Sequence, residues 1–492
     1  MQIAQGEILG LLAVNGHGMP ALLKLLETNL PLDDGYVYYG GELVNSWKMS
    51  GRTTNRISVI GAENRLVESL SVTDNIFVLR QGFRQEVIRT GLLEKQLKPF
   101  LEDIGMDIPM DIPVEKLHVF ERVVLELLRA VVFGHHLIVL NEIGTLISAE
   151  ELKKLHEILR HYASVGFSFL YICPHYEEVE QICGRCALLS HGRILKVVEG
   201  SGATDEILRI YDAEYAQMIR GRLERQKGLP KEKKVALMFS GLSGEHIKSL
   251  SMSVYAGECL SVQILDNDSF LELCGFLTEN KKPLSGAIRI NSRKERVSGG
   301  NRIGRRKGHT FSDRRVAVLV EQATKTMVFP ELSYMENLCI SLSMRMPAFW
   351  RKAKLRRSIR QEYGPILGEE VFDLPVEELS ERQKYQMIYT RILLAHPEVV
   401  FCIHPFKGAD LPHRMFIWKM LEMLLDHGIA VVILSLSLSD SLSLADRLLI
   451  VGQDETKEIL RENFASISEL VPWGYLYREE MRLTCNFEPF SH

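Results

Sequence analysis

The stretch Ala13-Val14-Asn15-Gly16-His17-Gly18-Met19-Pro20-Ala21 follows the segment Gly6-Glu7-Ile8-Leu9, which favours a strand, and precedes a leucine-rich segment that favours a helix. A strand, a glycine-containing turn and a helix in this order are typical of the phosphate-binding loop G-x-x-x-x-G-K-[ST]. In that alignment Ala13 replaces the first glycine, Met19 the lysine and Pro20 the hydroxyl residue that holds magnesium. The stretch therefore predicts the local fold of a phosphate-binding loop that has lost most of its phosphate chemistry.

An internal repeat organises the rest of the chain. The segment 70–76 (Leu-Ser-Val-Thr-Asp-Asn-Ile) matches the segment 332–338 (Leu-Ser-Tyr-Met-Glu-Asn-Leu), 262 residues further on. Matches with the same spacing are 113–117 with 375–379, Arg129 with Arg391, and Arg185 with Arg447. Because the spacing is constant across separate matches, we expect two copies of one domain.

Both copies show the same order of expected elements. A Gly-Glu turn leads into an apolar strand, at Gly6-Glu7 and again at Gly257-Glu258, and a charged, mostly helical segment follows. Each copy then has an apolar strand (137–140; 399–403), an amphipathic helix (150–162; 412–427) and another apolar strand (167–172; 429–435). Continuous apolar strands that alternate with helices indicate buried, mainly parallel sheets. The expected fold class is α/β.

Composition limits the classes of function. The chain has 492 residues, 46% of them hydrophobic and 25% charged, with a net charge of −4, so no broad basic surface indicates a nucleic-acid partner. No apolar run reaches the roughly 18–20 residues that span a bilayer, and a cytoplasmic protein is expected. Cys183 and Cys186 have C-x-x-C spacing without a second pair, which favours buried cysteines over a redox or zinc site.

Together these features resemble the tandem ATP-binding-cassette (ABC) proteins, and among them the ATPase subunits of ribose- and galactose-type sugar importers. The segments that carry the resemblance are Gly6-Glu7-Ile8-Leu9, Asn15-Gly16-His17-Gly18, the two Leu-Ser-x-x-x-Asn segments, Phe329-Pro330-Glu331, Leu379-Ser380 with Arg391, Pro405-Phe406-Lys407-Gly408-Ala409-Asp410, Glu177-Glu178-Val179 and Ala445-Asp446-Arg447. The resemblance covers nearly the whole chain.

The resemblance implies two tandem P-loop NTPase cassettes, each with a mainly parallel core sheet and a helical subdomain. The first cassette is expected at 1–200, a charged helical linker at 201–234 and the second cassette at 235–492. In the family, strands that carry an adenine-stacking aromatic precede the Gly-Glu turn. Only five residues precede Gly6, so the first cassette is expected to lack those strands, and a truncated gene model is the alternative explanation.

In this family, ATP is held between the phosphate loop, acidic strand and switch histidine of one cassette and the signature loop of the other. At the first such site the resemblance leaves Asn15, Gly16 and Gly18 as candidate nucleotide-binding residues, with Ser380 in the opposing signature segment. The charge-assisted hydrogen bond of the lost lysine is worth roughly 1.5–3 kcal/mol.

The acidic strand and the switch are also altered at this site. Asn141 replaces the magnesium-linked aspartate, and Glu142 occupies the position of the general base that activates water. Ala62 replaces the glutamine that senses the γ-phosphate. The switch histidine maps to Pro174, and His175 lies one residue late. Glu142 and His175 are therefore the residual catalytic candidates, and no metal site is predicted.

The second nucleotide site keeps fewer of the family's residues. Its departures from the family pattern are Ile264, Asn267 and Ser269 at the glycines, Phe270 at the cation, Asp266 and Asp268 beside the phosphate position, Ile403-His404 at the acidic pair, and Leu436 at the switch. Carboxylates beside a phosphate have the wrong sign. No nucleotide chemistry is expected here.

Two functions of different classes remain. The first is a pseudo-ATPase, a degenerate cassette subunit that acts as a scaffold or regulatory partner of a membrane transporter. The second is a functional ATP-binding subunit of a sugar importer with weak residual ATPase activity at the first site, using Glu142 and His175, so that ATP with magnesium would be a weak ligand. A ribosome-binding cassette factor is disfavoured because the 200–234 segment mixes both charge signs. Expected partners are membrane permease subunits or another cassette subunit, with the chain at the inner face of the plasma membrane.

Overall fold

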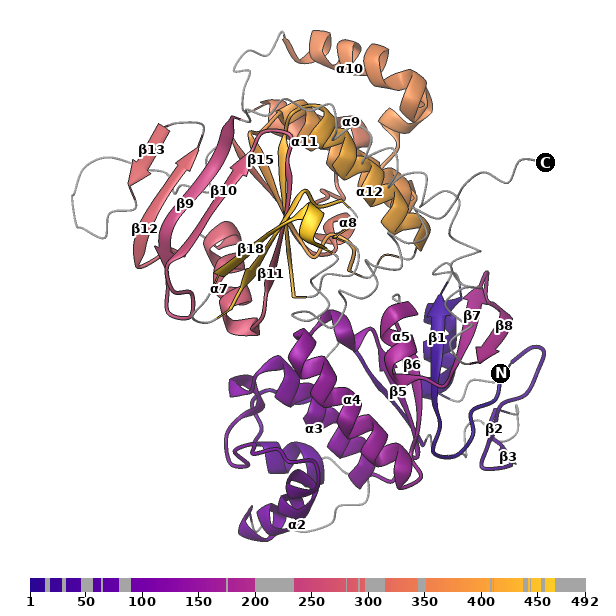
Figure 1. Ribbon diagram of the computed structural model, residues 1–492. Coiled ribbons are helices and arrows are strands. Elements are labelled where there is room, and N and C mark those ends of the chain that lie inside the picture. The colour runs from indigo at the N-terminus through magenta and orange to yellow at the C-terminus, as the bar shows by residue number, and fades with distance from the viewer. Residues whose placement is uncertain are drawn as a thin grey trace, which may run out of the picture. The chain divides into compact units, whose positions relative to one another are not determined.

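The computed structural model describes residues 1–13, 18–28, 32–45, 56–62, 65–78, 90–173, 176–199, 234–279, 281–290, 293–296, 315–343, 351–407, 409, 411–436, 441–442, 444–452 and 456–464. The chain divides into two compact units, residues 1–212 and 213–492 (Figure 1). All but the last residue of the predicted linker at 201–234 lies outside the described residues, so its helical character stays a prediction.

The first unit is built around one six-stranded sheet. Its strands are β1 (Ile8–Ala13), β2 (Tyr38–Tyr39), β3 (Glu42–Leu43), β4 (Ile57–Ile60), β5 (Leu137–Asn141), β6 (Ser168–Ile172), β7 (Arg185–Ser190) and β8 (Arg193–Glu199). Its helices are α1 (Met19–Thr28), α2 (Thr90–Asp103), α3 (Val119–Val132), α4 (Ala149–Ser164) and α5 (Tyr176–Ile182), with short helical turns at Asp74–Val78, Val114–Lys116 and Ile143–Thr145. The sheet order is β4-β5-β6-β1-β7-β8, and β8 alone among these six runs antiparallel to its neighbour.

Helices cover both faces of this sheet, which explains why its strands are apolar throughout. On one face Leu26 of α1 packs with Leu9 and Leu11 of β1. On the other face α5 approaches so closely that a Cβ atom at Gly10 would lie 2.3 Å from Cγ1 of Val179. Gly10 is therefore required by the packing of helix on strand.

The second unit has a matching six-stranded sheet and a further antiparallel sheet. Its strands are β9 (Val235–Ser243), β10 (Leu250–Tyr255), β11 (Cys259–Ile264), β12 (Ser285–Ile290), β13 (Arg293–Arg296), β14 (Val316–Leu319), β15 (Val399–Ile403), β16 (Ala430–Ser435), β17 (Arg447–Val451) and β18 (Thr456–Leu460). Its helices are α7 (Asn267–Thr278), α8 (Ala323–Thr326), α9 (Tyr334–Ser343), α10 (Arg351–Leu367), α11 (Glu381–Ala395) and α12 (Leu411–Asp426), with helical turns at Glu369–Asp373 and Val376–Glu378. The core order is β14-β15-β16-β11-β17-β18, the same order as in the first unit.

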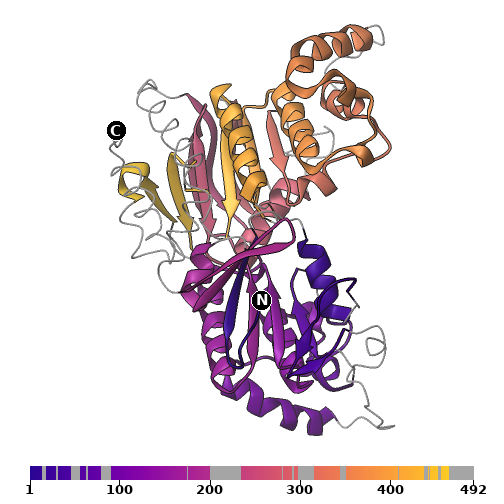
Figure 2. The ribbon, with the colours of Figure 1, turned by 90° about the vertical axis from the view of Figure 1, so that its right-hand side faces the viewer.

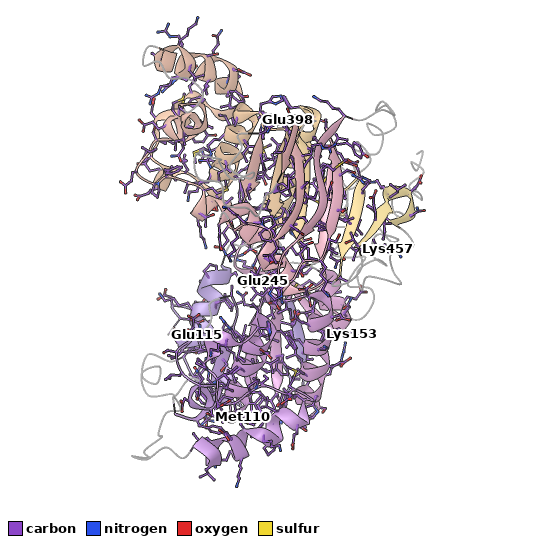
Figure 3. The ribbon with its side chains drawn as sticks, turned by 90° about the vertical axis from the view of Figure 1, so that its left-hand side faces the viewer. Met110, Glu115, Lys153, Glu245, Glu398 and Lys457 are labelled. Atoms are coloured by element: carbon purple, nitrogen blue, oxygen red, sulfur yellow. The ribbon has the colours of Figure 1, made fainter. Side chains whose placement is uncertain are left out.

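The two units differ in what covers the core sheet. In the second unit the antiparallel sheet β10-β9-β12-β13 packs on one face, with Phe239 stacked on Phe401 at 6.2 Å between ring centroids (Figure 2). The turn between β9 and β10, which carries Glu245 (labelled in Figure 3), is tied to α7 because the amides of 245–247 donate to the carboxylate of Glu272. Within the described part of the first unit, only the short β2–β3 pair is antiparallel besides β8, and no strand precedes β1.

The repeated motifs are structural anchors. The Asn75 side-chain amide donates to the carbonyls of Val67, Leu70 and Ser71, and the Asn337 amide donates to the three equivalent carbonyls. Both asparagines are fully buried, and buried amides need such partners. The matched Leu-Ser-x-x-x-Asn segments are therefore conserved between the two halves by a hydrogen-bonding requirement of the fold.

Paired arginines repeat as well. Arg129 donates to the carbonyl of Arg65 at 2.9 Å, and Arg391 donates to the carbonyl of Met327 at 2.8 Å. These bonds join α3 and α11 to the loops that precede the two Leu-Ser-x-x-x-Asn segments. The α/β fold with two tandem, mainly parallel cassettes is confirmed.

Candidate nucleotide sites

The turn after β1 retains the length of a phosphate-binding loop. β1 ends at Ala13 and α1 begins at Met19, which leaves five residues between strand and helix. Gly18 is required there, because its φ is +88° and a Cβ atom would lie 2.6 Å from Cα of Gly192. Its carbonyl accepts the amide of Leu22 at 2.9 Å and so opens the helix. Asn15 and Gly16 lie outside the described residues, and their nucleotide-binding role stays a prediction.

The side chain at the lysine position is used by the core. Met19 is half-buried and packs against the apolar cluster that holds Leu9, Leu11 and Leu26. Pro20 is exposed in the first turn of α1, where proline is tolerated because the first amides of a helix have no partner within it. Both substitutions suit the helix and supply no cation to a phosphate.

Glu142 lies where a catalytic base would be expected, directly after β5. Its backbone is left-handed (φ 56°), its amide donates to the carbonyl of Ile172, and its carbonyl accepts the hydroxyl of Thr145 at 2.7 Å. These bonds fix the turn at the carboxyl end of the sheet and leave the side chain half-buried. Asn141 at the end of β5 lies beside Gly61, next to the exposed Ala62. The other catalytic candidate, His175, lies outside the described residues together with Pro174.

A buried carboxyl group, that of Glu178, interacts electrostatically with Glu142, and the sequence names it only within the segment 177–179 that carries the resemblance. Glu178 of α5 is 3% exposed and accepts a hydrogen bond from the Tyr171 hydroxyl, which also contacts Nε2 of His156 at 3.2 Å. Its carboxyl group fills the space beside Gly144, where a Cβ atom would lie 2.3 Å away. Burial raises the pKa of Glu178, the charge of Glu142 adds to the rise, and hydrogen bonds from Tyr171 and Cys173 oppose it. Two carboxyl groups thus influence each other at this strand end.

Ser380 serves as a helix cap. It precedes α11, and its hydroxyl accepts the amide of Gln383 at 3.3 Å while the Gln383 side chain accepts the amide of Ser380 at 2.9 Å. The next residue, Glu381, pairs with Lys384 at 3.0 Å. Burial acts to raise the pKa of Glu381, but hydrogen bonds from Thr324 and Lys384 outweigh it and hold that pKa below its usual range. A carboxylate kept charged at this position repels phosphate.

The equivalent turn in the second cassette is closed. β11 ends at Ile264 and α7 begins at Asn267, so only Leu265 and Asp266 separate strand from helix. The helix starts early because the Asp266 carboxylate accepts the amide of Ser269 at 2.8 Å and caps it. The amides at the amino-terminal end of a helix attract an anion. At α7 the carboxylate of Asp266 takes the place of that anion.

At the positions where the family has its cation and acidic pair, the second cassette has two side chains that pack against each other. Phe270 is 5% exposed, and its ring centroid lies 4.6 Å from that of His404. His404 has the same left-handed backbone as Glu142 (φ 43°), and its amide donates to the carbonyl of Leu434 as that of Glu142 does to Ile172. Burial, with a contribution from the charge of Lys407, lowers the pKa of His404 to about 3, so the ring is neutral near pH 7.

An internal ion pair completes this cluster. Nζ of Lys407 lies 2.8 Å from one oxygen of Glu321, and the other oxygen lies 3.9 Å from Nε2 of His404. The Lys407 side chain is only 14% exposed, so its charge is already paired within the cassette. The second cassette therefore offers a phosphate group neither a free cation nor an open turn among these residues.

Neither metal nor redox chemistry gains support from the described part of the chain. No group of three or more His, Cys, Asp or Glu side chains suited to a metal ion occurs among those residues. Burial raises the pKa of Cys186 to about 12 and also raises that of Cys183, so both thiols are protonated. Among the described helices, none has the length and apolar character to cross a bilayer.

Comparison with known proteins agrees with this architecture. Residues 1–143 match the family model described as ABC transporter. Two solved structures share the fold over most of the chain: an RNase-L inhibitor (TM-score 0.56, 12% identity, 95% of this chain and 89% of that chain) and a complex of an archaeal ribosomal stalk protein with an archaeal ribosome recycling factor (TM-score 0.55, 13% identity, 93% and 86%). At these identities the likeness concerns the fold alone. The chain is therefore similar to ATP-binding-cassette proteins, and its two units share the strand order of a tandem repeat.

More specific similarity comes from curated relatives of nearly equal length. The chain is 25% identical over 456 residues to a ribose import ATP-binding protein of Rubrobacter xylanophilus, covering 92% of this chain and 89% of that protein. It is 24% identical to a xylose import ATP-binding protein of Photobacterium profundum (94% and 92%) and 22% identical to a nucleoside import ATP-binding protein of Lactococcus lactis (96% and 93%). Within the cassette proteins, the chain is therefore similar to the ATP-binding proteins of sugar and nucleoside importers.

Proposed function

We propose that this chain is a pseudo-ATPase, a double cassette that serves as a scaffold or regulatory partner of a membrane transporter. The observation that carries the proposal is the closed turn of the second cassette. Asp266 caps α7 two residues after β11, and Phe270 packs on His404 where phosphate and its base would lie. A site filled by buried side chains cannot admit a triphosphate without unpacking them.

The first cassette supports the same proposal by a different route. Its strand and helix remain five residues apart, but Met19 packs into the core and Asn141 carries no charge for magnesium. Removing single catalytic groups typically lowers rates by about 10²–10⁴ each, and here several are absent together. We expect weak nucleotide binding at most, and no turnover.

The proposed partners follow from the relatives, whose names describe import ATP-binding proteins. Proteins of that class work with membrane permeases, so we propose that this chain binds permease subunits or a second, competent cassette subunit. Its place would then be cytoplasmic, at the inner face of the plasma membrane.

Calorimetry with ATP and magnesium tests the proposal directly. We expect no binding, or binding only in the millimolar range, and no release of phosphate above background. Hydrolysis that disappears in the Glu142→Gln variant would contradict the proposal, because that loss would assign turnover to this chain and exclude a contaminant.

A restored loop gives a sharper comparison of the two cassettes. Met19→Lys with Pro20→Ser should raise ATP affinity about tenfold to a hundredfold, which corresponds to the roughly 1.5–3 kcal/mol of a charge-assisted hydrogen bond. The matched control is Phe270→Lys with Leu271→Ser, which should give no gain because the turn before α7 is too short. Equal gains in both variants would show that the closed turn does not exclude nucleotide.

The second candidate function is a working ATP-binding subunit of a sugar importer with one weak site. Glu142 favours it, because its left-handed turn after β5 is fixed by backbone hydrogen bonds and places a carboxylate residue at the strand end. Magnesium-dependent hydrolysis by the unmodified chain, abolished by Glu142→Gln and retained in Glu381→Gln, would establish this function.

A further inference from the structure

The helical part of the second cassette contains a helix whose charge differs from that of its counterpart in the first. α10 holds six basic residues and one acidic residue: Arg351, Lys352, Lys354, Arg356, Arg357 and Arg360 against Glu362. The helix α2, which occupies the same place in the repeat, holds two lysines against three acids. Since the two helices share one fold, the basic character of α10 is not required by the architecture.

The packed faces of the two helices are alike. Leu355, Ile359 and Tyr363 of α10 contact the apolar cluster around Tyr334 and Phe372. The equivalent stripe of α2, 262 residues earlier, is Leu93, Leu97 and Leu101, all buried. The same face of α10 and of α2 therefore packs against its subdomain, so the residues on their outer faces can be compared position by position.

Two of the four described cations of α10 have partners within the cassette. Arg356 lies 3.4 Å from Glu336, and Arg360 lies 2.5 Å from Asp373 with its guanidinium 5.5 Å from the centre of the Phe372 ring. These two arginines flank the packed stripe and stabilise the subdomain, and their charge has a structural explanation.

The charges of Lys354 and Arg357 are not explained by contacts within the subdomain. Both are exposed, on the side of α10 opposite Ile359, and neither forms an ion pair with any residue that the structure describes. α10 lies at the outer end of the second unit, away from its sheets (Figure 1). The nearby acids Glu362, Glu369 and Glu370 follow in the chain, at the carboxyl end of the helix. The amino-terminal half of α10 is thus an outward basic surface.

We propose that this surface, defined by Lys354 and Arg357, docks on the anionic headgroups of a phospholipid bilayer. Charge complementarity supports this occupant: long basic side chains on the outer face of a helix suit a negatively charged membrane surface, where each contributes about a factor of five to binding. The docking would hold the second cassette at the membrane face where the proposed permease partner resides. The proposal goes beyond the proposed function, because vesicles without permease test it.

Sedimentation of the full-length protein with vesicles provides the measurement. We expect binding to vesicles of phosphatidylcholine with phosphatidylglycerol, little binding to phosphatidylcholine alone, and weaker binding as salt rises because exposed charges are screened. Lys354→Gln with Arg357→Gln should weaken binding about 30-fold, given the contribution of each cation. The matched control on the first cassette is Lys95→Gln with Lys98→Gln on α2, which should leave binding unchanged.

Several results would overturn the proposal. One is an absence of binding to the anionic vesicles, and another is equal loss in the α10 and α2 variants. A third is binding of a single-stranded RNA or an acidic polypeptide through Lys354 and Arg357 without vesicle binding, which would assign the surface to another partner. Because both side chains are exposed, the glutamine variant should keep its thermal midpoint, which circular dichroism verifies. ATP binding plays no part in any of these outcomes, so they are independent of the pseudo-ATPase proposal.

Discussion

The turn after β1 and the turn after β11 hold the same place in the same strand order, but they have lost nucleotide chemistry in different ways. The first turn keeps five residues between strand and helix, and its losses are single side chains. The second keeps two residues, and an aspartate cap, a phenyl ring and an internal ion pair occupy the remaining space. One cassette has lost functional groups, whereas the other has also lost the length of the turn.

This difference separates the residues that the fold requires from those that only nucleotide chemistry requires. Asn75 and Asn337 make identical hydrogen bonds, and the strand-end turns at Glu142 and His404 have the same left-handed backbone. The side chain at that turn is free to be a carboxylate or an imidazole, because the backbone bonds alone fix the turn. Fold and chemistry are therefore separable at this position.

The largest effect that we expect is a loss of stability in acid that involves both cassettes. Burial, with a smaller contribution from the charge of Arg160, lowers the pKa of His156 to about 4, and burial and Lys407 lower that of His404 to about 3. In the unfolded chain both histidines bind a proton near pH 6.5. Between that pH and the folded pKa the unfolded state holds more protons, so stability falls as pH falls.

Between pH 7 and pH 4 the expected loss is about 3 kcal/mol for each histidine, at 1.36 kcal/mol per pKa unit. Urea unfolding from pH 7 to pH 4, followed by circular dichroism, measures it. His404→Gln should flatten the profile of the second cassette and His156→Gln that of the first. An unchanged profile in both variants would mean that neither ring is held neutral.

A second comparison concerns two equivalent ion pairs, one at the start of β17 and one at the start of β7. Arg447 and Glu258 are 10% and 2% exposed at 2.6 Å, whereas Arg185 and Glu7 are 32% and 16% exposed at 2.7 Å. Removing one partner of a buried pair leaves an uncompensated charge and costs about 4 kcal/mol. Arg447→Met should destabilise the second cassette by that amount, while Arg185→Met should cause a much smaller loss. Equal losses in denaturant titrations would contradict the difference in burial.

Much of the fold could be predicted from the repeat. A constant spacing of 262 residues predicts the shared strand order, and the apolar strands predict sheets covered on both faces. The early start of α7 was not predicted, although an aspartate such as Asp266 just before an apolar helical segment is a recognisable helix-start signal. The alignment to a phosphate loop placed both residues at ligand positions and obscured that signal.

The buried partner of Glu142 could not be predicted. Glu178 reaches the strand end only because Gly144 leaves room and because Tyr171 is on the adjacent strand. That proximity depends on three elements far apart in the sequence, and no spacing rule connects them. Conversely, the motif predicts a nucleotide contact for Ser380, and its capping bonds give it a structural role that the motif does not distinguish from phosphate binding.

Gly144 offers a smaller test of this contrast between the cassettes. Its counterpart in the second cassette is Phe406, whose ring fills the core, whereas Gly144 leaves space for the carboxyl group of Glu178. Gly144→Ala should cost about 2 kcal/mol, because the buried carboxyl group must move from its hydroxyl partner. Gly91→Ala is the control, since nothing lies within 4 Å of the added Cβ atom. A neutral Gly144→Ala in chemical denaturation would show that Glu178 can rearrange freely.

The smallest effect separates the two explanations of Ser380. As a helix cap, the hydroxyl contributes about 1 kcal/mol, so Ser380→Ala should lower the unfolding free energy of the second cassette by that amount. Ser380→Asp preserves an acceptor for the Gln383 amide and should restore most of the loss, although its negative charge would repel phosphate. If the aspartate variant retains both stability and any measured nucleotide affinity, the serine acts as a cap alone. If stability is retained while nucleotide affinity falls, Ser380 contacts phosphate and the first site is less degenerate than its P-loop implies.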